Sequence, residues 1–157
     1  MKKLTLLRLC LVLGCFLLAG CSDSGEPFEE KSYTPDAAVT EVRLDVQDRE
    51  IEVSLSEDEL IHIQYFENSK EYYDISVSDG NVLTMTSASG RSWTDYIGMK
   101  TAAENRKIAL QVPDALLDAL TLSTTNEDIS LPALAVAGSV SLSSNGGNIT
   151  FGELDVG

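Results

Sequence analysis

The chain of 157 residues has one histidine, His62, and few basic residues: 11 Lys and Arg stand against 25 Asp and Glu. A single histidine excludes a multi-histidine metal site and removes the commonest acid–base group from most catalytic designs. The formal net charge of −14 leaves no basic face for a nucleic-acid backbone or for anionic lipid. We therefore expect no nucleic-acid partner, no metal site and no cofactor.

The chain also lacks an uncharged run long enough to stay in a bilayer as a helix. After a basic start at Lys2, Lys3 and Arg8, the segment Leu9–Gly20 carries no charge and is rich in leucine. Its helix would span about 18 Å, against about 30 Å of hydrocarbon. This pattern is typical of the apolar part of a secretion signal.

The uncharged run closes with Leu18-Ala19-Gly20-Cys21, which resembles the lipobox of bacterial lipoproteins. The resemblance implies cleavage between Gly20 and Cys21, a diacylglycerol thioether on Cys21, and a palmitate-like acyl chain on the new amino terminus. Cys10 and Cys15 would leave with the signal, so the mature chain would hold neither a free thiol nor a disulfide. The alternative is a plain signal peptide with a chance cysteine.

Three segments follow from these features: a lipoprotein signal peptide (1–20), a lipidated N-terminus with a flexible tether (21–37), and a β-repeat domain (38–157). Ser22–Pro35 is polar and without periodicity, as in a solvated linker. The alternative is an ordered arm that docks through Phe28 and Tyr33. We expect lipid anchoring on the extracytoplasmic face of the cell membrane or the outer membrane. Ser22 is not Asp, so nothing there demands inner-membrane retention.

From Val39 onward, apolar and polar residues alternate with a period of two, which predicts strands with one buried face. The expected inward residues are Val42, Leu44, Val46, Ile51, Val53, Leu55, Ile61, Ile63, Tyr65, Tyr73, Ile75 and Val77. Polar turns such as 47–49 and 56–59 separate the runs, and we expect an antiparallel meander. For the last hairpin, a loop of Ser78, Asp79 and Gly80 places Ile75 opposite Leu83, with Gly80 left-handed. The alternative is a strand pair buried on both faces.

The alternation breaks between Thr86 and Asn105, a segment that holds the single tryptophan, Trp93, followed by Tyr96 and Ile97. One interpretation is a plug that folds over the sheet edge. The other makes Trp93 and Tyr96 an aromatic binding platform for a sugar or a peptide. Strand character returns at Lys107–Val112.

The stretches 120–137 and 140–157 match at an offset of 20 residues, and every matched apolar position stays apolar. A fixed period near 20 with short strands predicts a β-solenoid, so the fold class is all-β, a meander running into a solenoid. The alternative is two similar hairpins in a sandwich. Solenoid coils need stacked neighbours and a cap, so we expect the domain to be incomplete at Gly157, through truncation or because another chain covers that end.

These stretches resemble DUF4097, a bacterial adhesin-like family of unknown function whose members have strand repeats, over about Val39 to Gly157. The resemblance rests on 49–53, 61–65, 108–113, 120–129 and the coil after them. Family members usually show Asn-Gly-Asp-Ile at the turn, whereas this chain has Glu127 in place of the glycine. These motifs encode turns and core, and the family has no established catalytic residues to carry over.

No phosphate loop, dinucleotide fingerprint or nucleophile elbow occurs in the sequence. We expect His62 to be a solvated strand residue, and the acidic turns 57–59 and 127–128 lack the spacing of a dedicated Ca²⁺ loop. The leading hypothesis is a non-enzymatic, lipid-anchored scaffold or adhesin-like module that binds an envelope protein or glycan. One alternative is an envelope polysaccharide hydrolase with paired carboxylates. Another is a lipoprotein partner of an envelope-stress sensor.

Overall fold

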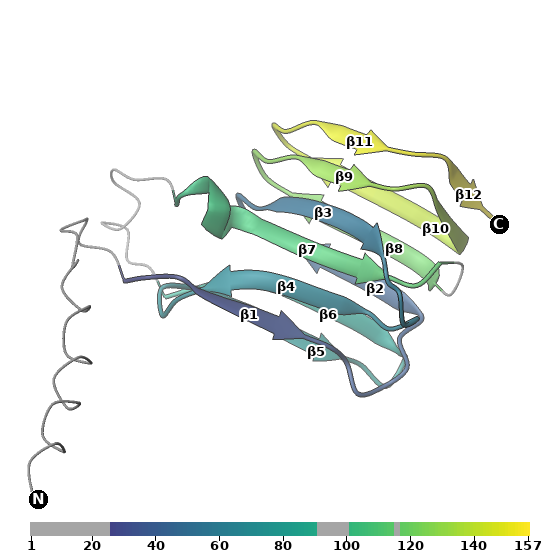
Figure 1. Cartoon of the computed structure of the whole chain (residues 1–157), viewed down its shortest axis with the longest axis horizontal. Helices are drawn as coiled ribbons and strands as arrows, with labels where there is room; N and C mark the ends of the chain where they lie inside the picture. The colour runs from purple at the N-terminus through teal and green to yellow at the C-terminus, as the bar shows by residue number, and fades with distance from the viewer. Residues whose placement is uncertain (1–25, 91–100, 115–116) are drawn as a thin grey trace, which may run out of the picture.

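The alternating segments of the computed structural model form two six-stranded sheets that lie face to face (Figure 1). The structure describes residues 26–90, 101–114 and 117–157. Within these ranges, the helical content is a single 3₁₀ turn, η2 (Ala103–Arg106), and no helix is long and apolar enough to cross a membrane. The prediction of an all-β fold is confirmed.

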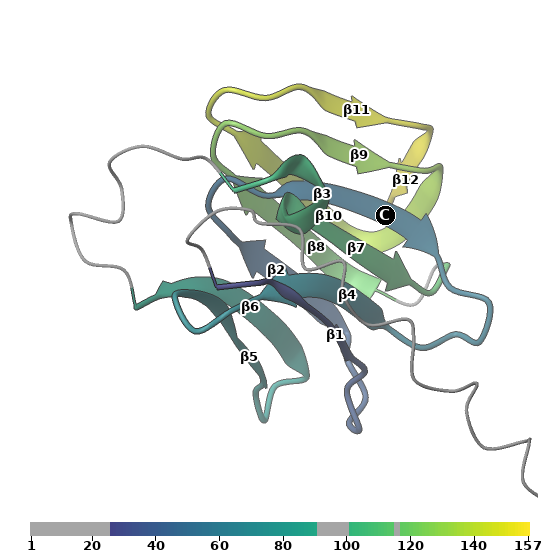
Figure 2. The same ribbon diagram turned by 60° about the vertical axis from the view of Figure 1, so that its left-hand side comes forward.

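The strands of each sheet come from distant parts of the chain. The first sheet contains β1 (Glu29–Tyr33), β4 (His62–Glu67), β7 (Lys107–Val112), β3 (Glu50–Leu55), β9 (Ile129–Leu131) and β11 (Ile149–Phe151). The second contains β12 (Leu154–Val156), β10 (Leu134–Ser144), β8 (Leu117–Thr124), β2 (Glu41–Asp45), β6 (Val82–Ser89) and β5 (Glu71–Val77). The edges β1 and β5 lie at one side of the molecule, opposite β11 and β12 (Figures 1 and 2).

Both sheets are mixed, so the expected antiparallel meander is wrong. Strand β2 lies between β6 and β8 and is parallel to both, while β3 lies between β7 and β9 and is parallel to both. Antiparallel pairing is confined to β1–β4, β4–β7 and β5–β6 among the described strands. The turn 47–49 carries the chain from one sheet to the other instead of closing a hairpin. Alternation has a period of two in either orientation and therefore does not distinguish them.

The matched residues of the C-terminal stretches are parallel neighbours in the sheets. Leu120 pairs with Val140 in the second sheet, and Ile129 pairs with Ile149 in the first. Leu134 likewise pairs with Leu154. Strands β8 and β9 belong to different sheets, so this part of the chain is not a pair of hairpins.

The core fills the space between the two sheets. Its fully buried side chains include Leu44, Ile51, Ile63, Leu83, Met85, Ile108, Leu110, Leu117, Leu120, Leu122 and Ile129. Leu55 was expected to face inward, yet it is 41% exposed at the end of β3, where the chain leaves the sheet. Tyr33, Tyr65, Tyr73, Ile75 and Val77 are only half-buried, because they border the open side near β1 and β5.

The β5–β6 hairpin has the expected three-residue loop, but it is shifted by one position along the chain. Val77 pairs with Leu83 and Ile75 with Met85, so the loop is Asp79-Gly80-Asn81. Asn81, rather than Gly80, adopts the left-handed conformation, with φ of 61°. Asn tolerates this region well, so the glycine was a misleading signal.

Strand β1 lies inside the segment 21–37 that we expected to be a flexible tether. Residues Glu29–Tyr33 pair antiparallel with β4, and Tyr33 is half-buried against the core. The tether expectation is therefore wrong for these five residues, which follow the alternative of an ordered arm. The segment is polar because strand β1 lies at the edge of the sheet and carries charged residues on both faces.

Candidate binding cleft

The residues singled out from the sequence as candidate sites lie outside the described part of the chain. This holds for the expected cleavage and lipidation site at Gly20 and Cys21, and for the aromatic pair Trp93 and Tyr96. The described residues instead form a cleft that the sequence did not indicate.

The cleft lies on the open side of the molecule, where β1 and β4 of one sheet face β5 of the other. Its volume is about 580 Å³, within the range of small-molecule sites. It is lined by Glu26, Pro27, Glu29, Lys31, Glu67, Asn68, Ser69, Tyr72 and Tyr73. We call it the tyrosine cleft. Its residues come from the start of β1, the β4–β5 turn and β5, which pairing brings together.

Two tyrosines, Tyr72 and Tyr73, line the cleft, and a third, Tyr65, contacts Tyr73. The rings of Tyr65 and Tyr73 meet edge to face, with centroids 5.3 Å apart. Tyr72 is on the other face of β5 and is 39% exposed at the rim. Burial raises the pKa of the Tyr73 hydroxyl, opposed by the nearby charge of Arg49. Burial also raises the pKa of Tyr65, and the charge of Glu67 adds to that effect.

The polar frame of the cleft is held by hydrogen bonds between the start of β1 and the β4–β5 turn. The Asn68 side chain donates to the Glu26 carbonyl at 3.2 Å, and the Ser69 hydroxyl donates to the Glu26 carboxylate. Asn68 Oδ1 accepts from the backbone N–H groups of Lys70 and Glu71. These bonds fix the turn, so the cleft is preformed rather than assembled by a ligand.

Two carboxylates face each other across the β1–β4 ladder at this frame. Glu29 is the register partner of Glu67, and Lys31 Nζ donates to Glu29 at 2.6 Å. That hydrogen bond lowers the pKa of Glu29 and raises the pKa of Lys31. The Glu67 backbone belongs to the β1–β4 ladder, but its carboxylate makes no hydrogen bond or ion pair with any described residue and is available to a ligand.

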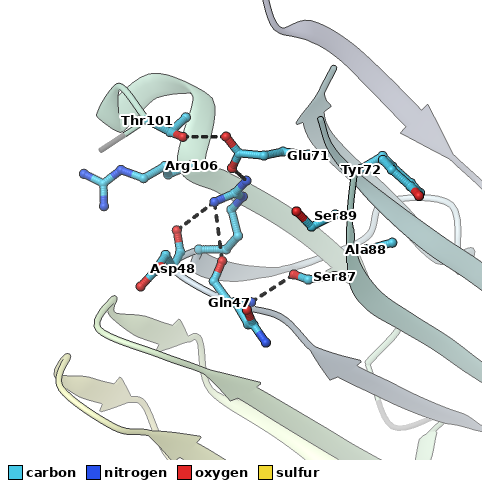
Figure 3. Close-up of a pocket in the computed structure, with 10 residues that line it drawn as sticks. Gln47, Asp48, Glu71, Tyr72, Ser87, Ala88, Ser89, Thr101 and Arg106 are labelled. Atoms are coloured by element: carbon cyan, nitrogen blue, oxygen red, sulfur yellow. Dashed lines mark hydrogen bonds and ion pairs between the residues drawn. The ribbon is translucent and has the colours of Figure 1, made fainter. Parts of the chain in front are cut away.

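A second pocket, of about 110 Å³, lies where the β2–β3 turn meets Glu71 and Thr101 (Figure 3), and Arg49 is one of its lining residues. The Arg49 side chain is 6% exposed and donates to Tyr73 Oη and Glu71 Oε2, both at 2.6 Å. It also donates to the carbonyls of Gln47 and Asp48. Thr101 donates to Glu71 on the other side. Arg49 therefore ties this turn to β5 and braces the Tyr73 wall of the tyrosine cleft.

His62 lies at the start of β4 with its side chain 29% exposed, near the solvated position expected. Its ring contacts Thr34 Oγ1 at 2.8 Å and the Asp58 carboxylate at 2.9 Å. The hydrogen bond from His62 lowers the pKa of Asp58. This trio joins the end of β1 to the β3–β4 turn, and we interpret it as a structural clasp.

The acidic turns are engaged within the protein. Glu127 is paired with Arg106, and the Asp128 carboxylate accepts from the Asn148 backbone. Over residues 26–90, 101–114 and 117–157, no group of three or more metal-ligating side chains comes together.

Sequence reasoning missed the cleft because its members are far apart in the chain. Glu26 and Ser69 are 43 positions apart, and Arg49, which braces the Tyr73 wall from the second pocket, is 24 positions from Tyr73. Arg49 sits in a turn that the sequence marks as polar, yet it is buried. The one available signal was Glu71-Tyr72-Tyr73, two tyrosines beside a carboxylate on a predicted strand.

The family model Toastrack DUF4097 matches residues 39–157. No curated protein sequence matches the chain significantly.

Three solved structures resemble the fold. A "putative adhesin" of Bacteroides fragilis is 15% identical, with a TM-score of 0.41. The match covers 84% of this chain and 56% of the Bacteroides chain. One of Parabacteroides merdae is 19% identical with a TM-score of 0.39, covering 82% and 57%. A "putative cell adhesion protein" of Clostridium sporogenes is 7% identical with a TM-score of 0.38, covering 83% and 98%. The chain thus spans little more than half of the first two proteins.

Proposed function

The chain belongs to the Toastrack DUF4097 family, and on that premise we propose that it is a lipid-anchored binding module on the extracytoplasmic face of the cell envelope. In this proposal Cys21 carries the lipid and the β-domain presents a ligand site. The module is adhesin-like and has no enzymatic activity. Its ligand is a component of the envelope.

The observation that carries the binding role is the tyrosine cleft. A preformed cleft of about 580 Å³ with an exposed tyrosine at its rim and a carboxylate without a partner is suited to hold a ligand. By contrast, the Arg49 pocket is smaller and its guanidinium already donates to four acceptors within the protein. We therefore assign binding to the cleft and support of the fold to Arg49.

The cleft favours binding over the alternative of polysaccharide hydrolysis. Glu29 and Glu67 lie across the ladder from each other, as a glycosidase pair would. A general acid, however, needs a raised pKa, and Lys31 lowers the pKa of Glu29. The Glu29 side chain is also 71% exposed, so water reaches it.

For the fold we propose a β-solenoid with a coil period of about 20 residues in the C-terminal part. The parallel pairs Leu120–Val140, Ile129–Ile149 and Leu134–Leu154 support this proposal. Such a scaffold would present the cleft at one end of a stack of coils.

Binding of the acylated protein to isolated envelope fractions, as a function of protein concentration, tests the function. The informative variant is Tyr72→Ala, with Phe151→Ala as its matched control, since both remove an exposed aromatic ring and Phe151 lies at the opposite edge. We expect Tyr72→Ala to weaken binding and Phe151→Ala to leave it unchanged. Equal effects of the two variants would contradict the proposal, and release of soluble sugar from the fractions would favour the hydrolase.

A further inference from the structure

We propose that the tyrosine cleft binds the zwitterionic headgroup of a membrane phospholipid, with the ammonium group at Glu67 and the phosphate toward Lys31. This inference rests on the proposed function, because it names the ligand of the same cleft and uses the same lipid anchor.

Glu67 supplies the site for the cation. It is half-buried at the end of β4 and lines the cleft together with Tyr73, and Tyr65 lies two positions before it on the same face of β4. The Glu67 carboxylate has no hydrogen-bond or ion-pair partner among the described residues. A partly desolvated carboxylate beside aromatic rings attracts an ammonium group through both the ion pair and the ring faces.

Lys31 supplies a second, opposite charge on the same face. Glu29 pairs with Glu67 and Lys31 with Tyr65, so Lys31 and Glu67 are diagonal neighbours across the β1–β4 ladder. The Lys31 side chain is 40% exposed, and its ammonium group makes one hydrogen bond, to Glu29. Since an ammonium group has three donors, Lys31 retains donors for a phosphate oxygen. The Glu67 carboxylate and the Lys31 ammonium group, which keeps donors beyond its hydrogen bond to Glu29, therefore match the two charges of a zwitterion.

The anchor places the cleft beside the bilayer. Five peptide units separate Cys21 from Glu26, which lines the cleft. Even a fully extended chain of that length spans at most about 18 Å. With a lipid on Cys21, the mouth of the cleft is held close to the headgroup layer, where phospholipid is the most concentrated ligand.

The charge of the protein distinguishes a zwitterionic headgroup from anionic headgroups and from soluble amines. The net charge of −14 repels anionic headgroups, whereas a zwitterion has no net charge to repel. A free amine such as a polyamine would satisfy Glu67 but would leave Lys31 without a phosphate. We therefore assign the ammonium group to a phospholipid headgroup rather than to a soluble amine.

The test uses the acylated protein in micelles of a neutral maltoside detergent, with chemical shifts of the Asn68 and Tyr72 amides, both in the cleft lining, as the readout. Three probes are titrated separately: phosphatidylethanolamine, phosphatidylglycerol and spermidine. The variant is Glu67→Gln. Glu30→Gln is its matched control, because Glu30 is a carboxylate of the same sheet that lies on the opposite face of β1, away from the cleft.

We expect saturable shifts with phosphatidylethanolamine and none with phosphatidylglycerol. Glu67→Gln should weaken saturation by about tenfold or more, as for loss of a charged hydrogen bond, and Glu30→Gln should not change it. Saturation by spermidine without a response to phosphatidylethanolamine would overturn the headgroup assignment. No response to any probe, in a protein whose Tyr72→Ala variant still loses envelope binding, would overturn this inference and leave the binding module standing. If no probe gives a response and Tyr72→Ala also leaves envelope binding unchanged, both the headgroup assignment and the binding module are overturned.

Discussion

Asp48 and Asn126 occupy equivalent places in two neighbouring turns, although 78 positions separate them in the chain. Both are left-handed, with φ of 52° and 60°, and the Asn126 side-chain amide donates to Asp48 Oδ1 at 2.8 Å. Beside them, Thr124 Oγ1 accepts from the Arg49 N–H and donates to the Arg49 carbonyl. A polar ladder thus joins the turns at one corner of the fold, at the place where the chain crosses between the sheets.

The same corner leads to a prediction at Gly147, in the turn that follows along the chain. A Cβ at Gly147 would overlap the carbonyl oxygen of Glu127, whereas a Cβ at Gly80 would meet nothing closer than Ser78 Oγ at 3.7 Å. We expect Gly147→Ala to lower the free energy of unfolding by about 1–3 kcal/mol, the cost of overpacking. Chemical denaturation measures it, with Gly80→Ala as the control. Similar curves for the two variants would mean that the turns are not packed against each other.

A second prediction separates the buried ion pair from an exposed one. Arg49→Met removes the guanidinium group of a side chain that is 6% exposed from Glu71, whose side chain is 12% exposed, and should cost about 3–5 kcal/mol of unfolding free energy. Arg43→Met removes a pair whose arginine side chain is 56% exposed and should cost at most about 1 kcal/mol. Urea denaturation of both variants checks the difference. An Arg49→Met protein as stable as the Arg43→Met protein would remove the bracing role of Arg49.

The sequence predicted the strands well because alternation reports a buried face directly. Val42, Leu44, Ile51 and Val53 are all buried as expected, and β7 has the predicted bounds. Which strands lie side by side could not be predicted in the same way. Strand β2 pairs with β6 and β8, which lie some 40 and 80 residues further along the chain, and no local pattern names such partners. The exception is the 20-residue offset, because similar segments that pair in parallel leave a visible repeat.

Of the features proposed for function, only the lipid attachment site could be predicted from the sequence. The lipobox-like segment is a local motif, whereas the tyrosine cleft needs β1, the β4–β5 turn and β5 to meet. Strand β1 itself reads as a polar linker, since Glu29, Glu30 and Lys31 carry charge on both of its faces. Inward charge at a sheet edge is what lines the cleft, and a sequence pattern built on apolar inward faces overlooks it.

A third prediction concerns alkaline pH. Burial raises the pKa of Tyr73 above the ordinary 10.0, so the fold favours its neutral form. Below that ordinary value both states are protonated and this contribution is fully present. As pH rises through it, the unfolded chain loses the proton first, so the free energy of unfolding should fall until the folded group also titrates. The difference in phenolate absorbance between wild type and Tyr73→Phe checks it. A difference curve centred at or below the ordinary tyrosine value would contradict the burial.

A fourth prediction separates the two interpretations of Trp93, which lies outside the described residues. If Trp93 is a plug, Trp93→Ala should lower the free energy of unfolding by about 3–5 kcal/mol, as for a large buried aromatic. If Trp93 and Tyr96 form a platform, stability should change little and envelope binding should fall. Denaturation and binding measured on the same variant distinguish the outcomes.

The last prediction concerns anchoring, on which both the proposed location and the headgroup inference depend. Cys21→Ser removes the thiol that would carry the diacylglycerol, and with it the signal for cleavage after Gly20. We expect the wild type to enter the detergent phase as a shortened, acylated chain and Cys21→Ser to remain unprocessed, without a label from radioactive palmitate. Cys15→Ser is the matched control, because it removes a thiol from the same apolar segment and should leave processing and labelling unchanged. The uncleaved apolar segment alone could draw a variant into detergent, so the label decides between the two causes. Palmitate on the Cys21→Ser protein, or its absence from the wild type, would show that a lipid on Cys21 does not anchor this domain. The argument that the anchor holds the cleft close to the headgroup layer would then fail.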